Sequence, residues 1–123
     1  MDTSEHQHED GFAAVLRDSL AGPVIECSGE LDLDQVPVLH AALHRALAVR
    51  PAPPMLLVDL AGLTFMDSSG LNELLRLRIE AARHGTAVHL ARPSRPVARV
   101  LKITGADRVF PVDSDVPGPR AAG

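Results

Sequence analysis

The order of apolar and polar residues predicts strands alternating with helices from residue 12 to residue 112. Two β-rich segments lie on either side of Gly22-Pro23, a pair that is typical of a turn and indicates an opening hairpin. The run from Met55 to Leu60 is short and almost continuously apolar, as expected for a strand that is buried on both faces. The expected strands are residues 12–19, 23–27, 55–60, 86–91 and 108–112.

Three segments have apolar residues at helical spacing and are expected to form amphipathic helices. The first runs from Asp34 to Val49, the second begins at residues 67–70 and ends at Gly85, and the third follows Ser94 and ends at Gly105. The apolar residues are Leu39, Leu43, Ala46 and Leu47 in the first helix, Leu71, Leu74, Leu75, Ile79 and Ala82, which form one stripe, in the second, and Val97, Val100, Leu101 and Ile103 in the third. Leu71, Leu74, Leu75 and Ile79 are expected to face inward.

This alternation predicts an α/β fold with crossover connections between strands. We expect a mixed, mainly parallel sheet of four or five strands with helices packed on it. Residues 12–112 are expected to form the folded domain. Residues 1–11 lack apolar periodicity and are expected to be a flexible leader, and residues 113–123, which are rich in Pro, Gly and small residues, a flexible tail.

Composition narrows the classes of function. A chain of 123 residues has the length of one globular domain. Its net charge of -4 and its lack of Tyr and Trp argue against a nucleic-acid partner. Cys27 has no second cysteine to pair with, which fits a reducing compartment. No stretch approaches the roughly 18 to 20 apolar residues of a membrane span, and residues 1–10 are acidic and polar, unlike a secretory signal. We therefore expect a cytoplasmic protein without a membrane partner.

The sharpest local feature is a polar, hydroxyl-rich segment, Asp67-Ser68-Ser69-Gly70, between the apolar strand and the second helix. One interpretation is helix capping, because Asp, Ser and Gly are favoured at helix N-termini. A second interpretation is a phosphate site, because free amides and the helix dipole stabilise an anion at that end. The two interpretations are compatible.

From Leu56 to Leu71 the chain reads LLVDLAGLTFMDSSGL, which resembles the core signature of the STAS domain in its anti-sigma factor antagonist branch. Three further segments resemble the same family in the same order: GELD at residues 29–32, LARPS at residues 90–94 and LKITGADRVF at residues 101–110. Together these segments cover nearly all of residues 12–112.

The resemblance implies a binding switch that needs no cofactor and is not an enzyme. Such antagonists capture an anti-sigma factor, commonly a serine kinase, which inactivates its captor by phosphorylation and so controls the release of a sigma factor for transcription; a phosphatase reverses the reaction. Ser68 matches the acceptor, which leaves the hydroxyl of Ser69 available for capping. The expected partner-binding residues are Asp32, Asp67, Ser68, Ser69 and Gly70. Asn72-Glu73 departs from the small or apolar residues of many members.

Other interpretations compete with this one. The same fold is used as a sensory or scaffold module that binds a small ligand or a larger signalling assembly. His40 and His44 have the i, i+4 spacing of zinc ligands, but no third ligand is evident, so no metal site is expected. Ser68 with His84 or His89 would suggest a hydrolase, yet there is no G-x-S-x-G segment. Cys27 lies in an apolar strand, which favours an inert core residue over a reactive thiol.

Overall fold

The computed structural model describes residues 11–119, which form the predicted alternation of strands and helices. The leader expected at residues 1–11 lies, apart from Gly11, outside the described residues. The strands are β1 (Phe12–Ser19), β2 (Gly22–Leu31), β3 (Met55–Met66), β4 (Ala87–Ala91) and β5 (Val112–Asp113), the helices are α2 (Val36–Leu47), α3 (Ser68–Arg83) and α4 (Arg95–Thr104), and two 3-10 turns are η1 (Leu33–Gln35) and η2 (Ala106–Arg108).

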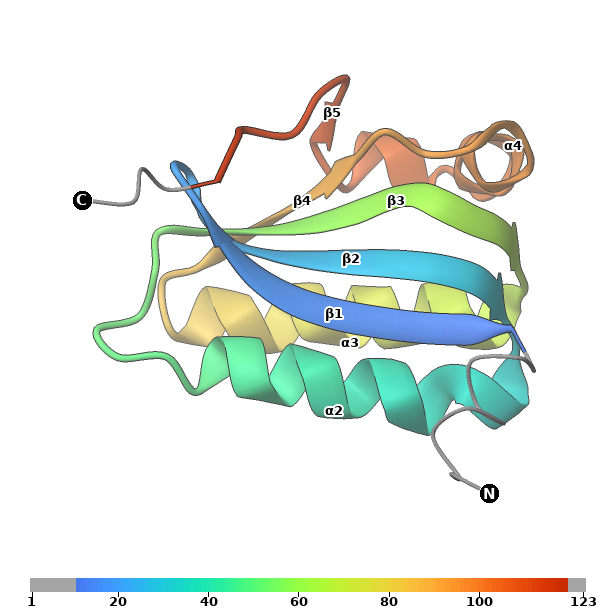
Figure 1. Ribbon diagram of the computed structural model, residues 1–123. Coiled ribbons are helices and arrows are strands. Elements are labelled where there is room, and N and C mark those ends of the chain that lie inside the picture. The colour runs from blue at the N-terminus through green and yellow to red at the C-terminus, as the bar shows by residue number, and fades with distance from the viewer. Residues whose placement is uncertain (1–10, 120–123) are drawn as a thin grey trace.

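The five strands form one sheet in the order β1-β2-β3-β4-β5. β1 is antiparallel to β2, and the remaining pairs are parallel, which confirms the predicted mixed, mainly parallel sheet. α2 and α3 lie side by side along one face of the sheet, and α4 packs against β3 away from them (Figure 1). Residues Leu56 to Leu60 of β3 are all buried, as the continuous apolar run predicts.

Several strand ends differ from the prediction because pairing between strands extends or shortens them. β2 and β3 continue beyond residues 27 and 60 since they pair with each other as far as Leu31 and Met66. The last strand begins only at Val112, rather than at residue 108, because the amides of Val109 and Phe110 both donate to the carbonyl of Ala106 and so fold the chain into a turn.

The inward face of α3 is partly different from the one expected. Leu75 is only half-buried, Ile79 is 56% exposed and Ala82 is exposed. The row that begins at Leu74 continues three and seven residues later, whereas Ile79 follows Leu74 by five residues and therefore lies outside the buried row of α3. The buried apolar residues of α3 are Leu71, Leu74, Leu77 and Ala81.

The other two helices follow the prediction more closely. The four residues of α2 that the sequence places at helical spacing are buried. In α4, Val97 and Leu101 are buried and Val100 is half-buried, but Ile103 is exposed. The buried face of α4 is therefore narrower than the set of its apolar residues suggests.

The chain beyond residue 112 is part of the described fold. The amide of Leu20 in the β1–β2 turn donates to the carbonyl of Gly118 at 3.2 Å. Val116 packs against a small second apolar cluster formed by Val24, Leu57 and Ala91. The ordered structure thus extends past the boundary expected at residue 112, and residues 120–123 lie outside the described part of the chain. Within residues 11–119, no helix combines the length and apolar character needed to cross a bilayer.

The two faces of α3 predict opposite effects of truncation. Leu74→Ala removes a fully buried side chain and should lower the free energy of unfolding by about 2–5 kcal/mol. Ile79→Ala on the same helix should change it by less than about 0.5 kcal/mol, because Ile79 is largely exposed. Urea denaturation of both variants measures the difference, and equal losses would mean that the buried face of α3 is assigned wrongly.

Candidate functional site at the start of α3

The two aspartates expected at the site follow the ends of neighbouring parallel strands. Leu31, the last residue of β2, is in register with Met66, the last residue of β3. The amide of Asp67 donates to the carbonyl of Leu31 at 3.3 Å, which ties the start of α3 to the end of β2. Asp32 and Asp67 therefore emerge at the same edge of the sheet, although 35 residues separate them in the sequence.

Asp67 is the N-cap of α3. Its backbone is extended, and its Oδ1 accepts from the amide of Ser69 at 3.0 Å and from the amide of Gly70 at 3.3 Å. The capping role left to the Ser69 hydroxyl by the sequence is thus taken by the carboxylate of Asp67. Ser68 is exposed, and within residues 11–119 its hydroxyl forms no hydrogen bond. The capping interpretation therefore applies to Asp67, and the Ser68 hydroxyl is left free for chemistry.

Two glycines allow the elements of the site to approach each other. A Cβ on Gly70 would lie 2.7 Å from Cγ and Cδ2 of Leu31, so only glycine lets the first turn of α3 pack on the end of β2. Gly29 has φ +90°, and a Cβ there would collide with the backbone of Gly11. Gly70 is buried and packs closely against Leu31, and its contact with a partner stays a prediction.

Two apolar side chains beside the aspartates were not recognised in the sequence. Leu33 follows Asp32 directly and is 69% exposed, and Phe65 precedes Asp67 by two residues and is 46% exposed. The side chain of Asp32 turns back to accept from the amide of Asp34 at 3.1 Å, which fixes η1 and presents Leu33 outward. Large apolar residues next to both aspartates were the available signal, because exposed apolar groups of this size are typical of contact surfaces.

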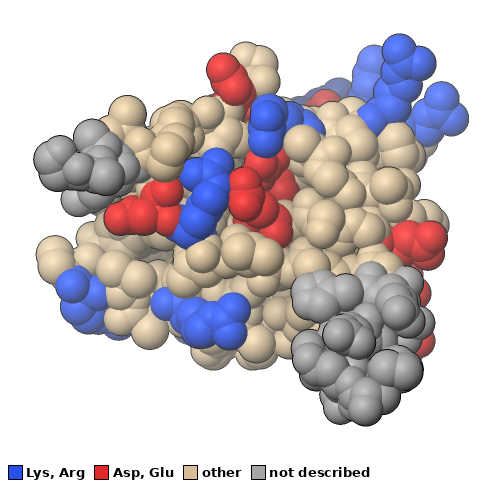
Figure 2. All heavy atoms as spheres, in the orientation of Figure 1, with Lys and Arg blue, Asp and Glu red and all other residues tan. Residues whose placement is uncertain are grey.

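A groove runs between η1, the start of α2 and α3, with Ser68 on its wall. Figure 2 shows basic side chains over α4 at the upper right, whereas acidic side chains are spread over the visible face and include a group at the right edge, where β2 finishes. The carboxylates at or next to the strand ends are those of Glu30, Asp32, Asp34 and Asp67. The groove is lined by Leu33, Val36, Ser68, Ser69, Asn72, Glu73 and Arg76.

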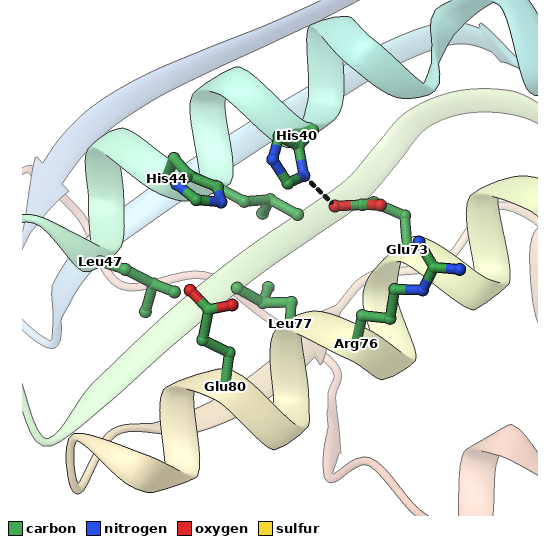
Figure 3. A pocket seen from close by; sticks show the side chains of 8 residues that line it. His40, His44, Leu47, Glu73, Arg76, Leu77 and Glu80 are labelled. Atoms are coloured by element: carbon green, nitrogen blue, oxygen red, sulfur yellow. Dashed lines mark hydrogen bonds and ion pairs between the residues drawn. The ribbon is translucent and has the colours of Figure 1, made fainter.

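The unusual Asn72-Glu73 pair now has a structural account. The Glu73 side chain is 8% exposed and points toward α2, where its Oε2 lies 2.7 Å from Nδ1 of His40 (Figure 3). This bond links α2 to α3 at the end of the groove formed by Glu73, one helical turn after Ser69. It gives a hydrogen-bond partner to a carboxylate that would otherwise be buried without one. Asn72 remains exposed on the groove wall.

The rings of His40 and His44 are 4.2 Å apart, but they do not belong to a metal-binding cluster. Among residues 11–119, no three or more His, Cys, Asp or Glu side chains come together in a way that could hold a metal ion. The histidines instead line a small pocket between α2 and α3 with Glu73, Arg76 and Glu80 (Figure 3).

The histidines considered for a hydrolase are far from Ser68. His84 lies at the opposite end of α3, 16 residues away, which corresponds to about 24 Å along the helix. His89 on β4 is in register with Leu57, nine residues before the end of β3, or about 30 Å along the strand. The structure therefore does not bring Ser68 together with either base.

Cys27 is buried in the main apolar core. Burial, with a smaller contribution from the charge of Asp59, raises the pKa of the Cys27 thiol to about 12. The thiol is therefore protonated and inaccessible, in agreement with the interpretation as an inert core residue.

Comparison with known proteins identifies the family. A family model described as "Mlab, STAS domain" matches residues 14–112. The chain belongs to the STAS domain family. This STAS domain is 32% identical over 89 residues to the anti-sigma-F factor antagonist RsfA of Mycobacterium tuberculosis, which covers 72% of the chain and 70% of RsfA.

Solved structures agree with this assignment. The STAS domain is similar to an anti-sigma factor antagonist from Mycobacterium paratuberculosis, with a TM-score of 0.77 and 25% identity over 87% of this chain and 89% of that one. It is also similar to the anti-sigma factor antagonist SpoIIAA of Bacillus. The unphosphorylated form gives a TM-score of 0.67 and 26% identity over 84% of this chain and 89% of SpoIIAA, and the phosphorylated form gives 0.64 and 26% over 84% and 92%. The predicted fold class and family are confirmed.

The capping role of Asp67 predicts a graded loss of stability. Asp67→Ala should lower the free energy of unfolding by about 0.5–2 kcal/mol, because the amides of Ser69 and Gly70 lose their acceptor. Asp67→Asn keeps an acceptor oxygen and should lose less, and Ser68→Ala should change stability by less than about 0.5 kcal/mol. Urea denaturation measures all three, and a larger loss in Ser68→Ala than in Asp67→Ala would contradict this division of roles.

The raised pKa of Cys27 predicts slow alkylation of the folded protein. A pKa of about 12 instead of the ordinary 9.0 lowers the thiolate fraction at pH 8 roughly a thousandfold, and burial excludes the reagent as well. Iodoacetamide should therefore label the protein rapidly in 8 M urea and hardly at all in buffer, as measured by mass spectrometry. Since the chain has 1 cysteine, the label reports on Cys27 alone. Rapid labelling without urea would show that the thiol is exposed.

Proposed function

We propose that this STAS domain is an anti-sigma factor antagonist that binds an anti-sigma factor and is switched off by phosphorylation of Ser68. The names of RsfA and of SpoIIAA support the class of partner, and the phosphorylated form of SpoIIAA supports a phosphate switch in this fold. The anti-sigma factor is then a serine kinase, and a phosphatase restores the binding form. The protein acts by binding, and Ser68 is a substrate rather than a nucleophile.

The observation that carries the proposal is the position of the Ser68 hydroxyl. It is exposed at the first residue of α3, next to two aspartates that close neighbouring strands. Asp67 makes the capping bonds to the amides of Ser69 and Gly70, so the fold does not depend on the Ser68 hydroxyl. Phosphorylation can therefore change the surface while the helix and its cap remain in place.

Electrostatics explains why a phosphate here would repel a partner that fits the unmodified surface. Phosphoserine adds about -1.5 to -2 charges. The first-turn amides that could offset this charge already serve Asp67, and Arg76, the cation on the groove wall, is eight residues along α3, or about 12 Å away. The new charge therefore adds to the acidic edge of the sheet and faces the partner.

The unmodified surface has the mixed character of a transient interface. Leu33 and Phe65 supply exposed apolar contacts, and Asp32 and Asp67 supply the charged positions between them. We propose that Asp32, Asp67, Ser68 and Ser69 contact the anti-sigma factor through this surface. Gly70 allows the first turn of α3 to pack closely on Leu31 and so positions these residues. A partner that fits carries apolar side chains for Leu33 and Phe65 and basic side chains for the aspartates.

The proposal predicts an order of affinities for the cognate anti-sigma factor. Ser68→Ala should bind about as tightly as the wild type, Ser68→Asp more weakly, and the phosphoprotein most weakly, because Asp carries less charge and a shorter reach than phosphate. If the phosphate introduces two unfavourable contacts of about 1.4 kcal/mol each, affinity falls roughly a hundredfold. Isothermal titration calorimetry measures the series.

The matched control is Ser114→Asp, which adds the same charge at an exposed serine just after β5. It should bind like the wild type.

After incubation with the kinase and ATP, mass spectrometry should place the phosphate on Ser68, and phosphate on Ser69 would reverse the roles of the two serines. Equal affinity of the phosphorylated and unphosphorylated forms would remove the switch and favour the sensory or scaffold alternative.

A further inference from the structure

α3 carries a second apolar surface that the domain itself does not cover. Ile79 and Ala82 belong to the apolar stripe of the sequence pattern, yet both are exposed, and Ile79 is 56% exposed. Leu75, one turn before Ile79, is only half-buried. A helix whose apolar residues extend beyond its intramolecular contact is what a helix with an additional partner would show.

Ile79 and Ala82 line a hollow between α3, the start of β4 and the segment that leads into β5. Val109, which is 39% exposed, and the exposed Pro111 form its opposite wall. β5 pairs only with Leu90 and Ala91, so within the described chain the first half of β4 is paired with β3 on one edge and with no strand on the other. The residues that matter for the argument are Arg78, Ile79, Ala82, Val88, Val109 and Pro111.

The charges around this hollow are mainly positive. Arg78 lines it and forms no ion pair with any residue in the range 11–119. Arg83 on α3 and Arg108 on η2 are exposed on the two elements that border it, and Asp107 is the acidic residue of η2. The carboxylates of α3 point elsewhere, since Glu73 and Glu80 line the pocket on the side of α2 (Figure 3).

We propose that this hollow is a second docking surface, which binds a segment of a partner protein that has apolar side chains flanked by acidic residues. The apolar side chains fill the space between Ile79 and Val109, and a carboxylate pairs with Arg78. Ile79 lies 11 residues from Ser68, or about 16 Å along α3, on the side of the helix toward β4 and β5. The surface can therefore be occupied while Ser68 stays accessible, and this inference does not rest on the proposed function.

A peptide selection tests the proposal without knowledge of the natural partner. A phage library of random 12-residue peptides is selected on the wild-type protein and counter-selected on Ile79→Asp, so that only binders that need Ile79 remain. We expect a consensus of apolar residues flanked by Asp or Glu. Arg78→Glu should weaken binding of the best synthetic peptide at least tenfold. Addition of that peptide to the wild-type protein should move the backbone amide shifts of residues 78–82, Val109, Phe110 and Val112 and not that of Ser68.

The controls lie on α4. Ile103→Asp places the same charge at an isoleucine that is 77% exposed, and Arg99→Glu reverses an exposed arginine. Both should leave peptide affinity within twofold of the wild type, and thermal unfolding confirms that every variant is folded. The proposal is overturned if no selected peptide depends on Ile79, if the consensus lacks acidic residues, or if Ile79→Asp instead abolishes self-association, which would make a second copy of the chain the occupant.

Discussion

The candidate site depends on the parallel pairing of β2 with β3 as far as their last residues. Leu31 and Met66 are in register, and the amide of Asp67 closes the pair on the carbonyl of Leu31. Because α3 begins one residue after Asp67, this pairing also fixes where the helix starts. A shift of register by one residue would move the side chains of β3 to the opposite face of the sheet and would separate the amide of Asp67 from the carbonyl of Leu31.

At the junction between β3 and α3, two residues of the same turn have different structural roles. Asp67 satisfies the amides of the first turn, and Gly70 lets that turn approach Leu31. Ser68 contributes to neither task, which leaves its hydroxyl free for modification. In the proposed function, stability and regulation reside in different side chains of this junction, because the cap bonds of Asp67 do not involve the Ser68 hydroxyl.

Sequence reasoning predicted the fold because the strongest patterns were local. The apolar run in β3, the polar start of α3 and the glycine that ends α4 required no knowledge of the neighbouring elements. Ser94 stands at the N-cap position of α4, but its hydroxyl donates to the carbonyl of Leu63 on β3 instead of capping the helix, so that expected side-chain cap is wrong. The ends of β2 and β3 were not predictable, since Gly29 to Leu31 and Ala61 to Met66 are strands through pairing with each other and, at Gly29, with Phe12 of β1. On α3, Leu77 and Ile79 are equally apolar, and the position of the sheet alone decides that Leu77 is buried.

The site was predictable only in part, because some of its features depend on contacts between elements that are distant in the sequence. The aspartates and serines stood out as a polar segment, but the exposure of Leu33 and Phe65 follows from turns that the sequence did not reveal. Glu73 was unexpected on a helix face that packs against α2, and its pairing with His40 needs the packing of α2 beside α3. Both features arise from contacts between residues distant in the sequence.

Release of a sigma factor tests the central claim most directly. A fluorescently labelled sigma factor in complex with its anti-sigma factor is titrated with the unphosphorylated protein and, separately, with the protein phosphorylated on Ser68, and release is followed by fluorescence anisotropy. The account predicts that the unphosphorylated protein frees the sigma factor at near-stoichiometric concentrations and that the phosphoprotein does not. Failure of both forms to release a sigma factor from any anti-sigma factor of the same cell, or equal release by both, would contradict it.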